Sequence, residues 1–149
     1  MKLAEALQER ADLNRKVEQL CSRLKLNALV QEGEKPAEDP SELLDELNGC
    51  ISRLEELIVM INHANCTIKV DGVTLTQMIA RRDALTLKIQ SYRQLITAAS
   101  CAVPRASQTE IKILSAVNVK ELQAETDKLA KELRELDNKI QQTNWTVDI

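Results

Sequence analysis

The sequence contains no phenylalanine, one tyrosine (Tyr92) and one tryptophan (Trp145), and it has only three glycines and three prolines in 149 residues. Sandwiches and barrels need many turn residues and are rich in aromatic and β-branched side chains. The scarcity of these residues therefore argues against an all-β fold. Leucine is the main apolar residue of a chain that is 44% hydrophobic. This composition favours long helices that pack through aliphatic side chains.

Residues that carry chemistry are also scarce. His63 is the single histidine, and Cys66 lies three residues after it, but two ligands do not make a zinc site. No Gly-x-Ser-x-Gly motif and no glycine-rich phosphate loop is present. The sequence therefore predicts no catalytic residue, no cofactor and no metal, and it favours a protein that is not an enzyme.

The net charge is −3, and no run of 18 apolar residues is present. We therefore expect no membrane span and no chain-wide attraction to nucleic acid. The N-terminal segment leads directly into a charged amphipathic pattern without the apolar stretch of a signal peptide, which predicts a cytoplasmic protein. No Cys-x-x-Cys motif occurs, so we expect free thiols in a reducing compartment, at Cys21, Cys50, Cys66 and Cys101.

Four segments show apolar residues at alternating intervals of three and four, the spacing of one helix face. The predicted helices are residues 2–30, residues 40–65 after an Asp39 cap, a third from the Thr74–Gln77 capping box to Pro104, and a fourth after Asn118. Their stripes are Leu3, Ala6, Arg10, Leu13, Val17, Leu20, Leu24 and Asn27; Leu43, Leu47, Cys50, Leu54, Leu57, Ile61 and Ala64; Leu75, Met78, Arg82, Leu85, Ile89, Tyr92, Ile96 and Ala99; and Leu122, Thr126, Leu129, Leu133, Leu136, Ile140 and Thr143. Leu44, Ile51 and Ile58 widen the second stripe, which suggests contact with more than one neighbour.

Short strands are expected between and after the helices. Alternating β-branched residues around Asp71-Gly72 predict a β-hairpin with a type I′ turn over residues 67–75. Residues 109–117 and the C-terminal Trp145–Ile149 segment are further strand candidates. In an up-down bundle the hairpin and the C-terminal strand fall at the same end and predict a small three-stranded sheet, with Trp145 covering the end of the bundle. The fold class is mainly α: one domain over residues 1–149, an antiparallel four-helix bundle or long helical hairpins with a small β-hairpin and short strands at the ends.

Two arginines interrupt the apolar stripes. In an up-down bundle Arg10 and Arg82 lie at the same level, where the other two helices present Glu55, Glu56, Glu135 and Asp137. Because a buried arginine needs an ionic partner, these six residues form a candidate polar layer. The alternative is that both arginines extend along their stems to reach water.

Charge is unevenly distributed along the chain. Residues 32–46 are acidic, as expected of a solvated loop and a helix N-terminus, or of a docking patch for a basic partner. Residues 81–112 are basic, with Arg81, Arg82, Lys88, Arg93, Arg105 and Lys112 against Asp83 and Glu110. A helical arm that binds RNA or the ribosome is therefore an alternative, although stacking aromatics are nearly absent.

Several segments carry a resemblance when they are taken together: residues 2–7 and 9–13, 31–34 and 38–40, 80–83, 107–112, 134–137 and 144–146. With these segments the chain resembles a family of short, uncharacterised bacterial helical proteins that are sometimes labelled septicolysin. The resemblance implies a largely helical bacterial protein without an established activity, and it implies no catalytic residues. A membrane-inserting cytolysin needs apolar or aromatic tips, which this chain lacks.

Wide apolar faces on several helices favour association, since a monomer rarely exposes such faces. The sequence therefore favours a structural or protein-interaction module that acts as a homo-oligomer, with Asp71, Gly72 and Trp145 as candidate end-cap or interaction residues. An RNA-associated arm is the first alternative. An enzyme that uses the Arg82 layer as an anion site is the second.

Overall fold

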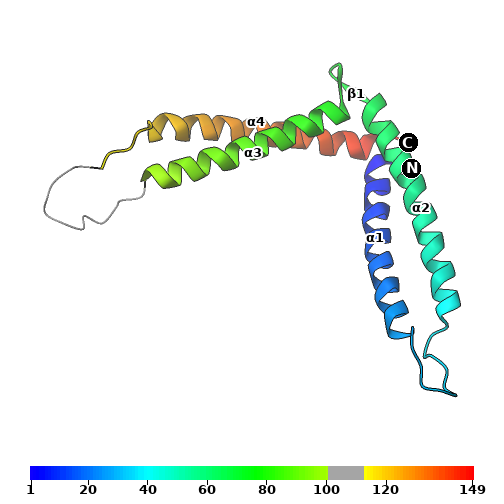
Figure 1. Cartoon of the computed structure of the whole chain (residues 1–149). Coiled ribbons are helices and arrows are strands. Elements are labelled where there is room, and N and C mark those ends of the chain that lie inside the picture. Colours follow the sequence, from blue (N-terminus) through cyan, green and yellow to red (C-terminus); the bar gives the residue numbers. More distant parts are fainter. Residues whose placement is uncertain (101–112) are drawn as a thin grey trace, which may run out of the picture. The chain divides into compact units, whose positions relative to one another are not determined.

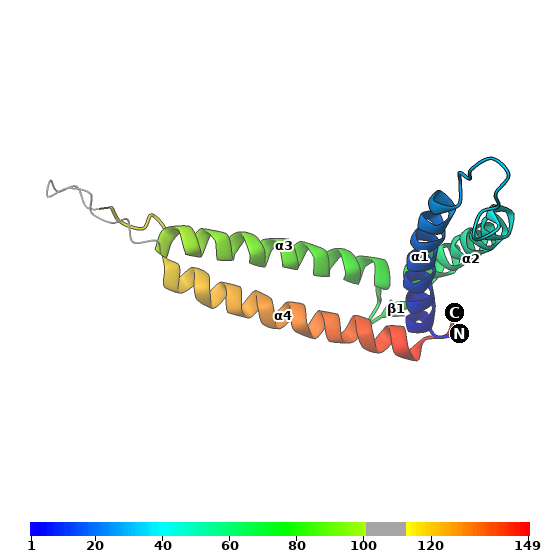
Figure 2. The same ribbon diagram turned by 90° about the horizontal axis from the view of Figure 1, so that it is seen from below.

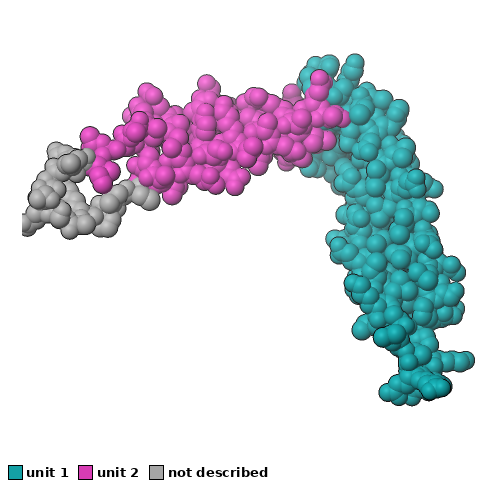
Figure 3. Space-filling model, in the orientation of Figure 1, with its two compact units in different colours: residues 1–75, 141–149 teal, residues 76–140 magenta. Residues whose placement is uncertain are grey.

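The computed structural model describes residues 1–100 and 113–149. Its elements in chain order are α1 (Leu3–Leu26), α2 (Pro40–Thr67), β1 (Lys69–Val70), β2 (Val73–Thr74), α3 (Leu75–Ser100) and α4 (Val119–Thr146) (Figure 1). The chain divides into two units, unit 1 with residues 1–75 and 141–149 and unit 2 with residues 76–140 (Figure 3). The predicted mainly helical fold with a small β-hairpin is confirmed.

Side-chain caps place the helix ends. The Asp39 carboxylate accepts a hydrogen bond from the Ser41 amide at 2.8 Å, and Asn118 accepts one from the Glu121 amide at 3.2 Å, so both predicted N-caps are confirmed. Helix α1 ends at Leu26, earlier than the predicted residue 30. The reason is Asn27, whose side-chain amide donates to the Arg23 carbonyl at 2.9 Å and caps the last turn.

Helices α1 and α2 form an antiparallel hairpin in unit 1. Buried Leu20, Leu43 and Cys50 form its core, and Leu13, Val17, Leu24 and Leu47 pack against them. All of these residues belong to the predicted stripes of the first two helices. Each fully buried leucine contributes about 1.5–3 kcal/mol through removal of its side chain from water.

The β-hairpin has the predicted turn. Lys69 pairs with Thr74 and Val70 pairs with Val73 in an antiparallel register. Both turn residues have positive φ, 53° at Asp71 and 83° at Gly72, as a type I′ turn requires. The strands are shorter than predicted because α2 continues to Thr67.

The C-terminal residues do not add a third strand to this hairpin. Helix α4 continues to Thr146, and Asp148 then forms an isolated antiparallel bridge with Lys2. The Leu3 amide donates to the Val147 carbonyl at 3.1 Å, so the last residues pair with the beginning of the chain. The sequence predicted a strand over residues 109–117. Residues 113–117 do not form a strand, and residues 109–112 lie outside the described residues.

Helices α3 and α4 lie side by side in unit 2, as both ribbon views show (Figure 1, Figure 2). Leu85, Ile89 and Leu129 are buried between them, with Tyr92, Leu133 and Leu136 packed around this cluster. The Cα atoms of α1 and α2 approach within 8 Å at many positions, whereas those of α3 and α4 do so at isolated positions at most. Helix α4 continues past residue 140 into unit 1 and therefore belongs to both units. That residues 1–149 unfold as one domain stays a prediction, which an unfolding measurement can test.

Candidate interaction surface

One face of the α1–α2 hairpin carries a series of ion pairs between elements. Arg23 of α1 donates to Glu38 in the connecting loop, with Nε–Oε distances of 3.1 Å. The Lys16 Nζ lies 2.7 Å from Glu46 Oε1 of α2. The α1 partners stand at seven-residue intervals and share one side of the helix.

The third ion pair of this series joins Arg53 of α2 to Glu9 of α1. The Arg53 Nε donates to Glu9 Oε1 at 2.7 Å, and its Nη2 donates to Glu9 Oε2 at 3.1 Å. Its Nη1 donates to Glu56 at 2.9 Å. A bidentate arginine–carboxylate pair has a defined geometry, so the Glu9–Arg53 pair restricts the relative orientation of α1 and α2 more than a lysine–carboxylate pair does.

These contacts shift the pKa values of the charged groups. The hydrogen bonds from Arg53, Arg23 and Lys16 are the main cause that lowers the pKa of Glu9, Glu38 and Glu46, respectively. The hydrogen bond to Glu46 in turn raises the pKa of Lys16. The hydrogen bonds to Glu9 and then to Glu56 raise the pKa of Arg53. Each pair therefore holds its two members in their charged forms.

The predicted polar-layer residues are divided between the two units. Arg10, Glu55 and Glu56 belong to unit 1, and Arg82, Glu135 and Asp137 belong to unit 2. Glu56 pairs with Arg53, and Arg10 is half-buried without an ion pair among the described residues. The Glu9–Arg53 pair places Arg10 and Glu55 at a similar level of the hairpin. Pairing across all four helices stays a prediction.

The unit 2 members have their own surroundings. Arg82 pairs with the neighbouring Asp83 at 2.9 Å, and its side chain is 33% exposed. It lines a surface hollow together with Asp137 and Arg134. Glu135 Oε1 lies 3.9 Å from Lys131 Nζ on the same helix. Arg82 and Asp137 therefore face the same hollow.

Sequence reasoning missed the residues that hold the hairpin together in register. Glu9, Lys16 and Arg23 recur every seven residues on the first helix, and Glu46 and Arg53 do so with opposite charge on the second. This pattern is typical of the flanking positions of paired helices and was the available signal. The predicted stripe places Asn27 on the inner face of the first helix, and the structure buries it. Its carbonyl oxygen accepts the Glu38 amide at 3.0 Å and fastens the loop to α1.

A different face of α2 exposes apolar side chains. Leu44, Ile51 and Ile58 stand seven residues apart and are 47%, 48% and 41% exposed, and Val59 is 63% exposed. These are the residues that widen the second stripe. Among the described residues none of these four side chains is buried, so this part of the α2 face is open to solvent. A shallow hollow of about 330 Å³ lies here, lined by Val17, Ile51, Leu54, Glu55, Ile58 and Val59.

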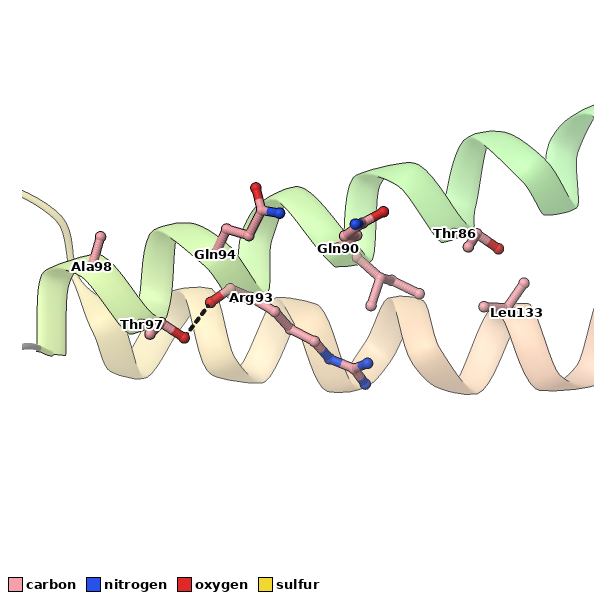
Figure 4. Close-up of a pocket in the computed structure, with 8 residues that line it drawn as sticks. Thr86, Gln90, Arg93, Gln94, Thr97, Ala98 and Leu133 are labelled. Carbon is pink, nitrogen blue, oxygen red and sulfur yellow. Dashed lines mark hydrogen bonds between the residues drawn. The ribbon is translucent and has the colours of Figure 1, made fainter.

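Unit 2 carries a hollow of about 620 Å³ along α3 (Figure 4). It is lined by Thr86, Ile89, Gln90, Arg93, Gln94, Thr97, Ala98 and Leu133. The Thr97 hydroxyl donates to the Arg93 carbonyl at 2.9 Å, and the Arg93 side chain extends in the direction of α4 (Figure 4). The lining contains no carboxylate, histidine or cysteine, so these residues supply no acid–base pair.

Other candidate groups are on the surface. His63 and Cys66 are exposed at the end of α2, and within the described ranges no three His, Cys, Asp or Glu side chains are placed to hold a metal ion. Trp145 is 58% exposed in the last turn of α4, whereas the adjacent Asn144 is buried. Trp145 therefore does not bury its ring over the end of unit 1. Among the helices that the structure describes, none is long and apolar enough to cross a membrane.

A family model described as a family of unknown function, DUF6847, matches residues 10–149. The chain belongs to the DUF6847 family.

A solved relative supports the fold of this DUF6847 protein. It is the crystal structure of a functionally unknown conserved protein from Corynebacterium diphtheriae, with 37% sequence identity and a TM-score of 0.87. The match covers 99% of this chain and 97% of the other. No curated protein matches the chain. Neither description carries the septicolysin label, and the family of uncharacterised proteins is the part of that resemblance that is confirmed.

Proposed function

We propose that this DUF6847 protein is a structural or protein-interaction module that acts as a homo-oligomer. The observation that carries the proposal is the exposed apolar face of α2, formed by Leu44, Ile51, Ile58 and Val59. Contiguous apolar surface on a folded protein marks sites of association, because water contact with it is unfavourable. Single exposed apolar residues are ordinary, but three at heptad spacing form a continuous seam.

The surroundings of this seam support a binding surface rather than a reaction centre. It borders a hollow lined by aliphatic side chains and one carboxylate, Glu55. Cross-helix ion pairs hold the two helices in register, so the seam is presented on a stiff support. A rigid helical hairpin loses little conformational freedom when it associates.

Size-exclusion chromatography with light scattering tests this proposal on the full chain. We expect a mass that is a multiple of 16.7 kDa, with a 260 to 280 nm absorbance ratio typical of protein without nucleic acid. A monomer at all concentrations up to the millimolar range would contradict the proposal.

An RNA-binding arm is the second candidate, and one observation favours it. Arg82 and Arg134 line one hollow of unit 2, and Arg93 lines a second one. Arginines along a groove suit phosphate contacts, which supply most nucleic-acid affinity. A monomer that elutes with a high 260 nm absorbance, removed by ribonuclease, would put this function first.

The proposed compartment is the cytoplasm. Cys21 and Cys50 are free thiols within the described residues, which fits a reducing environment. Cytolysis is not part of the proposal. The apolar seam consists of aliphatic residues, and charged residues flank it on the α1–α2 hairpin. A membrane-active surface carries aromatic anchors at the interface.

A further inference from the structure

The α1–α2 hairpin has two different faces, and seven-residue spacing keeps them apart along its length. Arg53 belongs to the face with the cross-helix ion pairs, and Ile51 belongs to the apolar seam. Two residues along a helix correspond to about 200° of rotation, so the two side chains point to opposite sides. One face of the hairpin is therefore closed by its own ion pairs, and the other is open.

The open face is bordered by one cation and one anion that have no partner within the described part of the chain. Glu55 lines the hollow on the α2 side. Arg10 stands one heptad before Val17, which lines the hollow on the α1 side, so both lie on the same face of α1. Neither Arg10 nor Glu55 forms an ion pair among the residues that the structure describes, whereas the neighbouring Glu9, Arg53 and Glu56 all do.

Arg10 and Glu55 also lie at nearly the same level of the hairpin. Arg10 follows Glu9 directly, and Glu55 is two residues after Arg53, the bonded partner of Glu9. With a rise of about 1.5 Å per residue, the two charged residues differ in level by about one helical turn or less. The open face therefore has a positive edge on α1 and a negative edge on α2 at one height.

We propose that this face binds the same face of a second copy of the chain, around a twofold axis parallel to the helices. Such an axis places α1 of each copy against α2 of the other and preserves the level of every residue. Arg10 of each copy then meets Glu55 of the second copy, and two identical ion pairs form. The inference rests on the proposed function and names the partner and the contact surface.

The arrangement also accounts for the width of the α2 face. Four helices packed around one axis need apolar positions that contact two neighbours each. Leu44, Ile51 and Ile58 remain 47%, 48% and 41% exposed in unit 1, and in the proposed dimer they fill the core between two hairpins. All adjacent helices in this bundle run antiparallel, as they do within one hairpin.

The first test is the substitution Ile51→Glu, which places a charge at the centre of the seam. We expect the dimer dissociation constant, measured by sedimentation equilibrium, to rise at least tenfold. Leu87→Glu is the matched control, because Leu87 is 65% exposed on α3 in unit 2 and lies outside this face. Circular dichroism of both variants verifies that the helices are retained. Loss of association with Leu87→Glu but not with Ile51→Glu would overturn the inference.

The second test exchanges the charges. The variants Arg10→Glu and Glu55→Arg should each associate at least tenfold more weakly than the wild type, because each homodimer contains two like-charged pairs. An equimolar mixture should associate like the wild type, since the mixed dimer restores both opposite pairs. Pairing of Arg10 and Glu55 within one chain cannot produce this rescue, because neither variant contains both charges.

The outcomes separate this inference from the proposed function. A wild-type oligomer with no rescue in the mixture keeps the homo-oligomeric function but contradicts this surface and register. A wild-type monomer contradicts both. A different protein bound stoichiometrically at the Ile51 seam, in place of a second copy, also overturns the inference.

Discussion

The guanidinium of Arg53 donates two hydrogen bonds to the carboxylate of Glu9, which lies 44 residues earlier in the chain, at 2.7 and 3.1 Å. This contact sets the register of α1 against α2. It belongs to the same series as the Lys16–Glu46 pair and the Arg23–Glu38 pair. We therefore expect the free energy of unfolding to depend on pH through these ion pairs.

Stability should decline in acid because of these carboxylates. The pKa of Glu9 is lowered in the folded chain from its ordinary value of 4.5, chiefly by the hydrogen bonds from Arg53. Such a group stabilises the fold fully above its unfolded pKa, and this stabilisation is lost as the pH falls through the folded pKa. We therefore expect Glu9→Gln to be less stable than wild type at pH 7, with a difference that shrinks below about pH 4.5. Urea unfolding at a series of pH values measures this.

Glu18→Gln is the control for that experiment. Glu18 is an exposed carboxylate of α1 without an ion pair among the described residues. Its substitution should leave the pH dependence of unfolding unchanged. Identical pH profiles for Glu9→Gln and the wild type would show that the Arg53 contact does not stabilise the fold.

Asn27→Ala should destabilise the hairpin. The Asn27 side chain is 9% exposed and joins the Arg23 carbonyl to the Glu38 amide. Its removal leaves both backbone groups without this partner, at a cost of about 1–3 kcal/mol in the free energy of unfolding. Chemical denaturation measures the change, and Asn138→Ala at an exposed position of α4 serves as control. Equal stability of Asn27→Ala and wild type would contradict the capping role.

Two glycines should respond in opposite directions to alanine. Gly49 lies within α2, and a Cβ there would meet no atom within 4 Å, so it does not serve a close helix approach. Gly49→Ala should raise the free energy of unfolding by about 0.5–1 kcal/mol through helix propensity. Gly72 has a φ of 83°, and alanine there should lower stability by about 1–2 kcal/mol. Thermal melts of both variants give the comparison, and a destabilised Gly49→Ala would show a contact at this position.

Arg82→Met tests the polar layer. Arg82 is the cation beside Asp83 and borders the hollow that contains Asp137, so its loss leaves both carboxylates with one positive neighbour fewer. We expect a lower free energy of unfolding than in Arg15→Met, where a 70% exposed arginine pairs with Asp12 on its own helix. If Arg82→Met leaves stability and association unchanged, the layer is wrong.

The sequence alone predicted which residues of each helix face inward. Leu3, Leu20, Leu57, Leu85 and Ile140 are among the buried residues, and all stand in the predicted stripes. Even the polar members Asn27, Thr126 and Thr143 are buried. These positions are predictable because helical periodicity is a local property: a side chain's direction follows from its place in the 3.6-residue turn. Caps at Asp39 and Asn118 and the turn at Asp71-Gly72 are local for the same reason.

The tertiary structure decided which helices pair closely and which surfaces remain open. The helix pattern did not show that Leu44, Ile51 and Ile58 would stay exposed in their unit, or that Arg53 would bond Glu9. It also did not show that the C-terminal residues pair with Lys2 in place of the β-hairpin. Each of these facts depends on contacts between residues far apart in the chain. Periodicity determines the direction of a side chain around its own helix, but only packing of whole elements determines what it meets there.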